Sequence, residues 1–143
     1  MKDIHSYWAF LVIFTVALGA VNAIAGVLTK KDFGNKDFKV NLFGLIATHT
    51  QFMFGAILFF MSDKVLWFRD NVDVGLIMKT SSLRLYNVEH PFLMIVAAIL
   101  VTIGYSKHKK KLISAPKFKT IAIFYSLALI AMLLMIPWKA WLF

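Results

Sequence analysis

The sequence contains no cysteine and few charged residues. The absence of cysteine excludes disulfides, thiolate metal sites, iron–sulfur clusters and covalent haem attachment through a Cys-x-x-Cys-His motif. Any bound metal or haem must therefore rest chiefly on histidine or methionine. Charged residues are 16% of the chain and hydrophobic residues 60%, whereas soluble domains are about 25% charged and 45–50% apolar. The composition predicts a membrane protein.

Motifs of common soluble enzymes are also absent. The chain has no phosphate-binding loop, dinucleotide fingerprint, metalloprotease helix or nucleophile elbow, which argues against a self-contained hydrolase or kinase. The net charge of +9 is concentrated in two short stretches between apolar segments. This pattern is typical of membrane topology and not of nucleic-acid binding.

Apolar segments predict a single domain that is an all-α membrane protein, a four-transmembrane-helix bundle with helices at about 7–28, 40–62, 83–106 and 120–138. Each is close to the length of about 20 residues that crosses a bilayer. The connections at 30–39 and 107–119 together hold ten basic and two acidic residues. Because basic loops stay in the cytoplasm, we expect both termini to be periplasmic in a multi-pass protein of a bacterial inner membrane.

The third span has two possible starts. The helix can begin at Pro91, or it can begin near Ser82 and be kinked at Pro91 by the lost hydrogen bond to the Asn87 carbonyl. We favour the second start because it forms one inward stripe from the following residues: Leu83, Tyr86, Asn87, His90, Met94, Ala97 and Val101.

Two of the four histidines are expected at the same depth. Counting 1.5 Å per residue from the periplasmic boundary puts His5 and His90 within roughly 6 Å of it and His49 about 20 Å deep. A b-type haem needs two axial imidazoles from facing helices and an apolar slot, so His5 and His90 are the candidate metal ligands, and Met could replace one of them. His108, set among lysines, is expected to be a solvated loop residue.

Ionisable groups also gather at the mouth of the third span. Arg84, Tyr86 and Glu89 stand beside His90, and charges at membrane depth persist where they bind or pair with something. Arg84 can meet a haem propionate and Glu89 can hold a ligating imidazole. Alternatively, Arg84 and Glu89 are an interfacial ion pair that orients the helix or binds anionic lipid. The candidate cofactor-binding residues, besides His5 and His90, are Arg84, Tyr86, Glu89 and His49.

A second polar layer is expected nearer the cytoplasmic side. It contains Asn22, His49, Gln51 and Tyr125, and we expect His49 to face the interior because lipid offers its ring no partner. This layer can be a proton or quinone site, or a second haem ligand. The interpretation we favour is an interhelical hydrogen-bond clamp.

Motifs along nearly the whole chain carry a resemblance to a family. They are His5-Ser6, Thr48-His49-Thr50-Gln51 with Gly55, Glu89-His90-Pro91 after Arg84, Thr102 to Lys107, and Ile136-Pro137-Trp138. The sequence resembles short bacterial four-helix membrane proteins labelled cytochrome b-like. It departs from the Glu-x-x-His-Arg arrangement of larger haem-handling membrane proteins, since Glu89 and His90 are adjacent.

We therefore expect a small b-type cytochrome that carries electrons to or from a quinone or a larger respiratory complex. One alternative is a non-catalytic accessory subunit of an inner-membrane complex, in which the polar layers only fix helix packing. Another is a proton or metal conductor that uses Arg84, Glu89, His90 and His49 as steps. In each case the expected surroundings are membrane lipid, with no nucleic acid.

Overall fold

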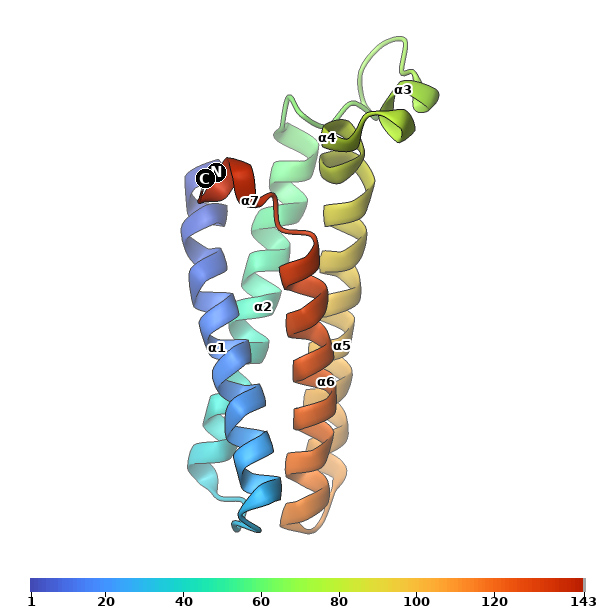
Figure 1. Ribbon diagram of the computed structural model, residues 1–143. Coiled ribbons are helices and arrows are strands. Elements are labelled where there is room, and N and C mark those ends of the chain that lie inside the picture. Colours follow the sequence, from blue (N-terminus) through green and yellow to red (C-terminus); the bar gives the residue numbers. More distant parts are fainter. Residues whose placement is uncertain (143) are drawn as a thin grey trace.

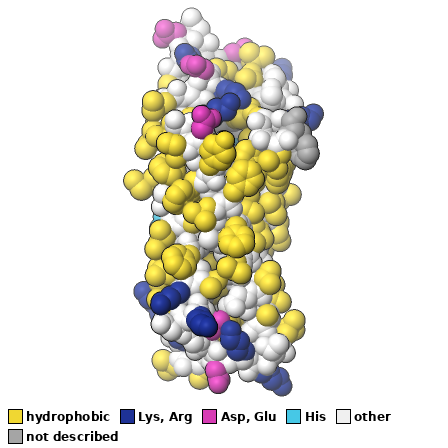
Figure 2. Space-filling view, turned by 90° about the vertical axis from the view of Figure 1, so that its left-hand side faces the viewer, with side chains coloured by type: hydrophobic (Ala, Val, Ile, Leu, Met, Phe, Trp, Pro, Cys, Tyr) yellow, Lys and Arg dark blue, Asp and Glu magenta, His cyan; other side chains and the backbone are white. Residues whose placement is uncertain are grey.

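The computed structural model describes residues 1–142, which form helices and no strand (Figure 1). Within this range four segments are long and apolar enough to cross a membrane: α1 (Lys2–Leu28), α2 (Asn35–Met61), the run Ser81–Lys110 and α6 (Ser114–Leu134). Hydrophobic side chains cover the middle of the face drawn in Figure 2, and charged side chains gather towards its ends. The predicted multi-pass, four-helix architecture is confirmed.

The bundle has two unlike ends (Figure 1). Both termini lie at one end, together with α3 (Val74–Lys79), α4 (Ser81–Arg84) and α7 (Trp138–Trp141); we call this the terminal end. The short connections from α1 to α2 and from α5 (His90–Lys110) to α6 lie at the other, the loop end. α1 contacts α2 and α6, and α5 contacts the same two helices, so α1 and α5 occupy opposite corners. The α2–α5 pair is the least closely packed.

Several helix ends lie outside the apolar segments that predicted them. α1 begins at Lys2, α2 at Asn35 and α6 at Ser114, each earlier than expected, and the third run continues to Lys110. α6 ends at Leu134, before the chain turns into α7. Hydropathy marks the stretch that lies in hydrocarbon, whereas the backbone stays helical into the interface, where lysine side chains reach water.

The third span is a continuous helical run from Ser81 to Lys110. It consists of α4, a π-helical turn η1 (Leu85–Glu89) and α5. The predicted start near Ser82 is therefore confirmed. The irregularity at Pro91 takes the form of a π turn directly before it, which the sequence did not specify.

Proline accounts for this π turn. Pro91 has no N–H to donate to the carbonyl of Asn87, and the His90 N–H bonds to the Leu85 carbonyl, five residues back. The indole N–H of Trp67 donates to the freed Asn87 carbonyl at 2.9 Å. A side chain from the preceding connection thus satisfies the acceptor that proline leaves open, as a bilayer requires.

Tyr125 of α6 sits where three helices meet. It is fully buried, and its ring lies against Gly19 of α1 and Gly44 of α2, where a Cβ atom would stand 2.8 and 3.1 Å from ring carbons. The Tyr125 hydroxyl donates to the carbonyl of Asn41 on α2 at 2.6 Å. One side chain therefore ties α1, α2 and α6 together.

Gly19→Ala should destabilise the bundle, because the added methyl group has to displace the Tyr125 ring or move α1. We expect the free energy of unfolding to fall by about 1–3 kcal/mol, the usual range for overpacking a core. The measurement is the midpoint of thermal unfolding in a fixed detergent, which should be lower than that of the wild type. The control is Leu18→Ala on the lipid-facing side, where Leu18 is 44% exposed. Equal midpoints for the two variants would contradict the close packing at Gly19.

Candidate functional site

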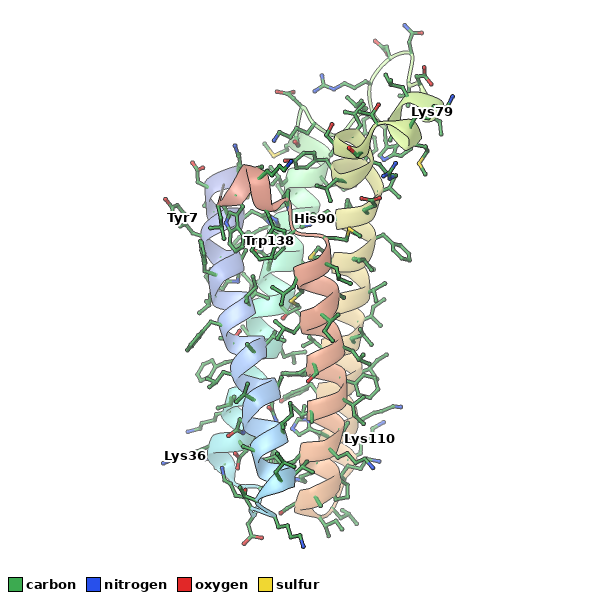
Figure 3. The ribbon with its side chains drawn as sticks, in the orientation of Figure 1. Tyr7, Lys36, Lys79, His90, Lys110 and Trp138 are labelled. Atoms are coloured by element: carbon green, nitrogen blue, oxygen red, sulfur yellow. The ribbon has the colours of Figure 1, made fainter. Side chains whose placement is uncertain are left out.

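His5 and His90 come together at the terminal end of the bundle. Their ring centres are 6.2 Å apart and their planes lie at 81°, although α1 and α5 occupy opposite corners. The predicted level match of these two histidines is confirmed. In Figure 3, His90 lies near Trp138 of α7, at the end of the bundle that holds the termini.

Two further groups complete what we call the terminal cluster: Gln51 and the Met135 carbonyl. The Nδ1–H of His90 donates to the Met135 carbonyl at 2.8 Å. The Gln51 amide nitrogen donates to the His5 carbonyl at 2.9 Å and lies 3.5 Å from His5 Nε2. Within residues 1–142, His5 Nδ1 and Gln51 Oε1 are buried without a hydrogen-bond partner. The cluster therefore holds buried hydrogen-bonding capacity that the fold does not use.

Space for the His5 ring comes from a glycine on α2. A Cβ atom at Gly55 would stand 3.2 Å from His5 Cε1, so a larger side chain would press on the imidazole. Above it, Trp141 of α7 donates its indole N–H to the Ser6 carbonyl at 3.2 Å and stacks on Phe10 at 4.4 Å between ring centres. α7 thus holds the start of α1 in place over the cluster.

Arg84 and Glu89 bind each other. Arg84 Nε lies 2.6 Å from Glu89 Oε1, and an Arg84 guanidinium N–H donates to the Met78 carbonyl at 2.8 Å. Residues five apart do not face each other on an α-helix, but the π turn between these two brings them together. The expected contact of Glu89 with His90 is not formed, because the Met135 carbonyl takes its place. The ion-pair alternative describes the observed geometry.

Tyr86 is engaged with the preceding connection. The Lys64 ammonium lies 4.4 Å from the Tyr86 ring centre and donates to the Tyr86 hydroxyl at 3.2 Å. Asn87 pins the same connection: it accepts from the Leu66 N–H at 2.7 Å and donates to the carbonyls of Lys64 and Leu83 at 3.0 and 2.8 Å. The sequence identified Asn87 only as an inward residue, and its structural role was missed.

The expected inner polar layer does not exist as one layer. His49 is exposed on the lipid-facing side, with Nε2 at 2.7 Å from the Thr102 hydroxyl of α5, so the expectation that it faces the interior is wrong. Gln51 belongs to the terminal cluster. Residues two apart on a helix point to nearly opposite sides, so Gln51 inside requires His49 outside. His49 is therefore not an interior step towards His90 in a conducting path.

Asn22 and Tyr125 make separate contacts nearer the loop end. Asn22 donates to Asp37 Oδ1 at 2.9 Å, the Lys31 ammonium to the same oxygen at 3.0 Å, and the Gly34 N–H to Asp37 Oδ2 at 2.9 Å. Asp37 is only 3% exposed. This is an interhelical clamp of the kind expected, but its acidic centre was assigned to a loop. The spacing of Gly34 and Asp37, typical of a helix start, was the signal that could have found it.

His108 is not a solvated loop residue. It lies within α5, fully buried, with ring centres 5.0 to 6.0 Å from three aromatic rings: Phe33, Phe38 and Tyr105. Its Nδ1–H donates to the Tyr105 carbonyl. The lysines around it in sequence point outward, because residues one or two apart on a helix face different directions.

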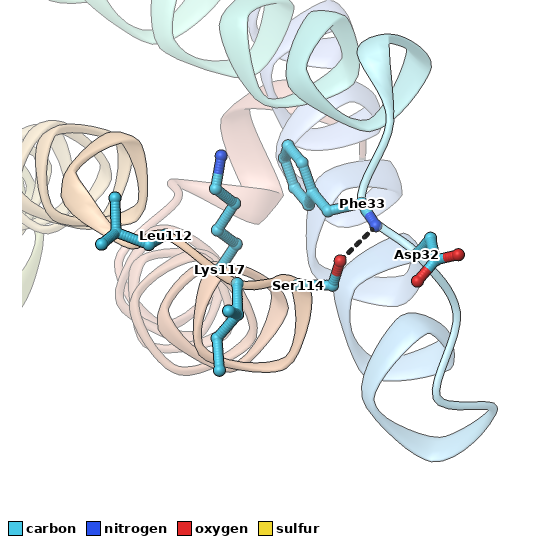
Figure 4. Close-up of a pocket in the computed structure, with 6 residues that line it drawn as sticks. Asp32, Phe33, Leu112, Ser114 and Lys117 are labelled. Carbon is cyan, nitrogen blue, oxygen red and sulfur yellow. Dashed lines mark hydrogen bonds between the residues drawn. The ribbon is translucent and has the colours of Figure 1, made fainter.

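Two surface hollows in the described residues lie away from the terminal cluster. The larger, about 420 Å³, is lined by Asp32, Phe33, Leu112, Ile113, Ser114 and Lys117 at the loop end. In it the Phe33 N–H donates to the Ser114 hydroxyl at 2.8 Å (Figure 4). The other lies between the ends of α1 and α6, at Leu28 and Lys119. Neither hollow borders His5 or His90.

Metal ligation by side chains alone is limited. Within the described range no three histidine, aspartate or glutamate side chains converge in a way that could hold a metal ion. A haem iron differs because its macrocycle supplies the equatorial ligands, so two axial groups suffice. Of the four histidines, His5 and His90 are the two whose rings lie side by side, 6.2 Å apart between centres.

Comparison with protein-family models, curated proteins and solved structures found no match for the chain. The interpretation of the terminal cluster therefore rests on its own geometry.

Asp37→Leu should destabilise the loop end, because Asn22 and the Gly34 N–H lose their acceptor in a buried site. We expect the free energy of unfolding to fall by about 2 kcal/mol. Lys31 adds little to this loss, because it is half exposed and can turn to water. Asp37→Asn, which keeps an acceptor oxygen, should lose less. Asp32→Leu, at an exposed position, should leave the unfolding midpoint near that of the wild type. A midpoint for Asp37→Leu equal to that of Asp32→Leu would contradict the clamp.

Proposed function

We propose that this protein is a small b-type cytochrome that binds haem b at the terminal cluster, with His5 and His90 as axial ligands. The observation that carries the proposal is the separation of the two imidazoles. A bond from a metal ion to an imidazole nitrogen is about 2.0–2.1 Å long, so two imidazoles that share one ion would have ring centres no more than about 6 Å apart. The His5 and His90 ring centres lie 6.2 Å apart.

Two features of the surroundings support this role. Ligating histidines generally donate their second N–H to a carbonyl or carboxylate, and His90 donates Nδ1–H to the Met135 carbonyl, which leaves its Nε2 lone pair for a metal. His5 Nδ1 and Gln51 Oε1 are buried and without a partner in the described residues. Buried groups of this kind are usually hydrogen-bonded, so their availability favours a bound group.

Room for the macrocycle has to come from movement of side chains. Neither hollow reaches the histidine pair, and admission of a flat ring requires the residues beside the imidazoles to shift. Haem would supply one-electron chemistry. The chain would supply the axial ligands and a seal of aromatic residues in α7. Arg84 and Tyr86 can turn towards a propionate only by leaving Glu89 and Lys64.

The cellular setting follows from the charge distribution. The loop end carries the two basic connections, and we place it in the cytoplasm of a bacterial cell by the positive-inside rule. The terminal cluster then faces the periplasmic side of the inner membrane. An electron partner is either a quinone in the bilayer or a redox protein of a larger complex.

A second candidate is an accessory subunit without a cofactor. It is favoured by the way most polar groups are paired inside the chain, including Arg84 with Glu89 and Asp37 with Asn22 and Lys31. In that case the purified protein is colourless and remains attached to another membrane protein in mild detergent.

A reduced-minus-oxidised visible spectrum of the purified protein tests the proposal. We expect a sharp alpha band and close to one haem per chain, lost in His5→Ala and in His90→Ala because each removes an axial ligand. His49→Ala is the matched control and should keep the band, since His49 points to the opposite side of α2 from Gln51 and does not contact His5 or His90. Circular dichroism establishes that each variant is folded.

A flat spectrum from protein produced with ample haem would contradict the cytochrome proposal. Loss of the band in His49→Ala, with the band kept in folded His5→Ala, would move the haem to another site.

A further inference from the structure

His49 is a polar side chain on the lipid-facing surface near the middle of the membrane. It lies 14 residues from Asn35 and 12 from Met61, the ends of α2, or roughly 20 Å from each end at the helical rise. Its side chain is exposed and meets α5 through Thr102. A histidine in contact with hydrocarbon is unfavourable unless both ring nitrogens are satisfied.

The proton positions follow from the hydrogen bonds of Thr102. Its hydroxyl has a single proton, which it donates to the Ala98 carbonyl at 2.7 Å. The 2.7 Å contact between His49 Nε2 and the same hydroxyl oxygen therefore requires the proton to be on Nε2. A neutral imidazole carries one ring proton, so His49 Nδ1 has a free lone pair. No described residue bonds it.

No described side chain donates to this lone pair. The exposed hydrophobic positions around it on α2 and α5 are Ile46, Met53, Ile57, Ile95, Ile99 and Ile103, and the exposed Ser106, one turn beyond Thr102, makes no hydrogen bond with His49. A second copy in the same membrane has the same orientation, so its surface at this depth offers these side chains and another Nδ1 acceptor. Self-association through this face cannot satisfy His49. The missing donor has to come from a different molecule.

We propose that this surface binds a lipid-soluble hydroquinone, whose hydroxyl group donates a hydrogen bond to His49 Nδ1. Water and lipid headgroups stay near the helix ends, about 15 Å or more from the middle of the hydrocarbon. A hydroquinone dissolves in the bilayer interior, carries an O–H donor and has an aromatic ring that can contact Ile46 and Ile99. The loose packing of α2 against α5 leaves the histidine accessible from lipid.

The oxidation state of the ligand is the discriminating property. A quinone has only carbonyl acceptors, which face the Nδ1 lone pair without a proton between them. The site therefore selects the reduced form. This binding depends only on α2 and α5, so it stands whether or not haem is bound at the terminal cluster.

The test is a titration of the full-length protein in lipid nanodiscs with a short-chain benzoquinol, kept reduced without oxygen, and separately with the corresponding quinone. The readout is the ¹⁵N signal of His49 Nδ1 together with equilibrium dialysis. We expect the quinol to shift that signal and to bind about tenfold more tightly than the quinone. A tenfold difference in affinity is about what one hydrogen bond contributes in a membrane.

Three variants separate the site from general partition into lipid. His49→Phe should remove the preference for the quinol. Thr102→Val should weaken it, because the imidazole is then free to present either an N–H or a lone pair. Ile57→Phe, two turns away on the same face and 42% exposed, should bind like the wild type.

Equal binding of quinol and quinone by the wild-type protein would overturn the proposal. So would a cross-link from position 49 to another polypeptide in native membranes that persists with excess quinol, because a partner helix would then supply the donor. A colourless protein that still selects the quinol would refute only the cytochrome proposal.

Discussion

The missing N–H of Pro91 is the constraint on which the terminal end depends. Within a bilayer every backbone acceptor needs a partner, and Trp67 supplies one for the Asn87 carbonyl. The π turn that accompanies the proline pairs Arg84 with Glu89. It also sets the rotation of the helix at its end, and so the direction in which His90 points. The direction of His90, the pairing of Arg84 with Glu89 and the docking of the 62–80 connection therefore all follow from one residue that has no N–H to donate.

The shared level of His5 and His90 could be predicted because both stand near the starts of apolar segments. Because the two histidines lie at the same level and both point inward, their rings meet although α1 and α5 occupy opposite corners of the bundle. The faces were harder to predict. In Thr48-His49-Thr50-Gln51 the histidine was placed inside by its polarity, but Gln51 contacts His5 and therefore forces His49 outward. Because an α-helix has 3.6 residues per turn, two residues that are two apart cannot both point into the bundle.

Residues beyond the hydropathy signal escaped prediction. Asp37 and His108 carry the sequence character of loops, with lysines on either side, yet both are buried at the loop end. The helices continue past the hydrocarbon, where lysines turn to water and the opposite side of the same helix can bury a carboxylate or an imidazole. Charge density along the chain therefore marks the end of the bundle at which the basic connections lie and misplaces the polar core beside them.

Polar side chains of the bundle differ in how much of their hydrogen-bonding capacity the fold uses. Asn87 uses its amide oxygen and nitrogen in three hydrogen bonds and accepts another at its carbonyl, so it has little capacity left for a ligand and acts as a fastener. In the described residues the terminal cluster keeps two buried atoms without a partner, His5 Nδ1 and Gln51 Oε1, whereas Asn41 and His108 keep one each. The exposed His49 keeps its Nδ1 open. Open capacity of this kind is unfavourable in an apolar medium. A ligand at the terminal cluster or at His49 would supply the hydrogen-bond partner that the described residues do not.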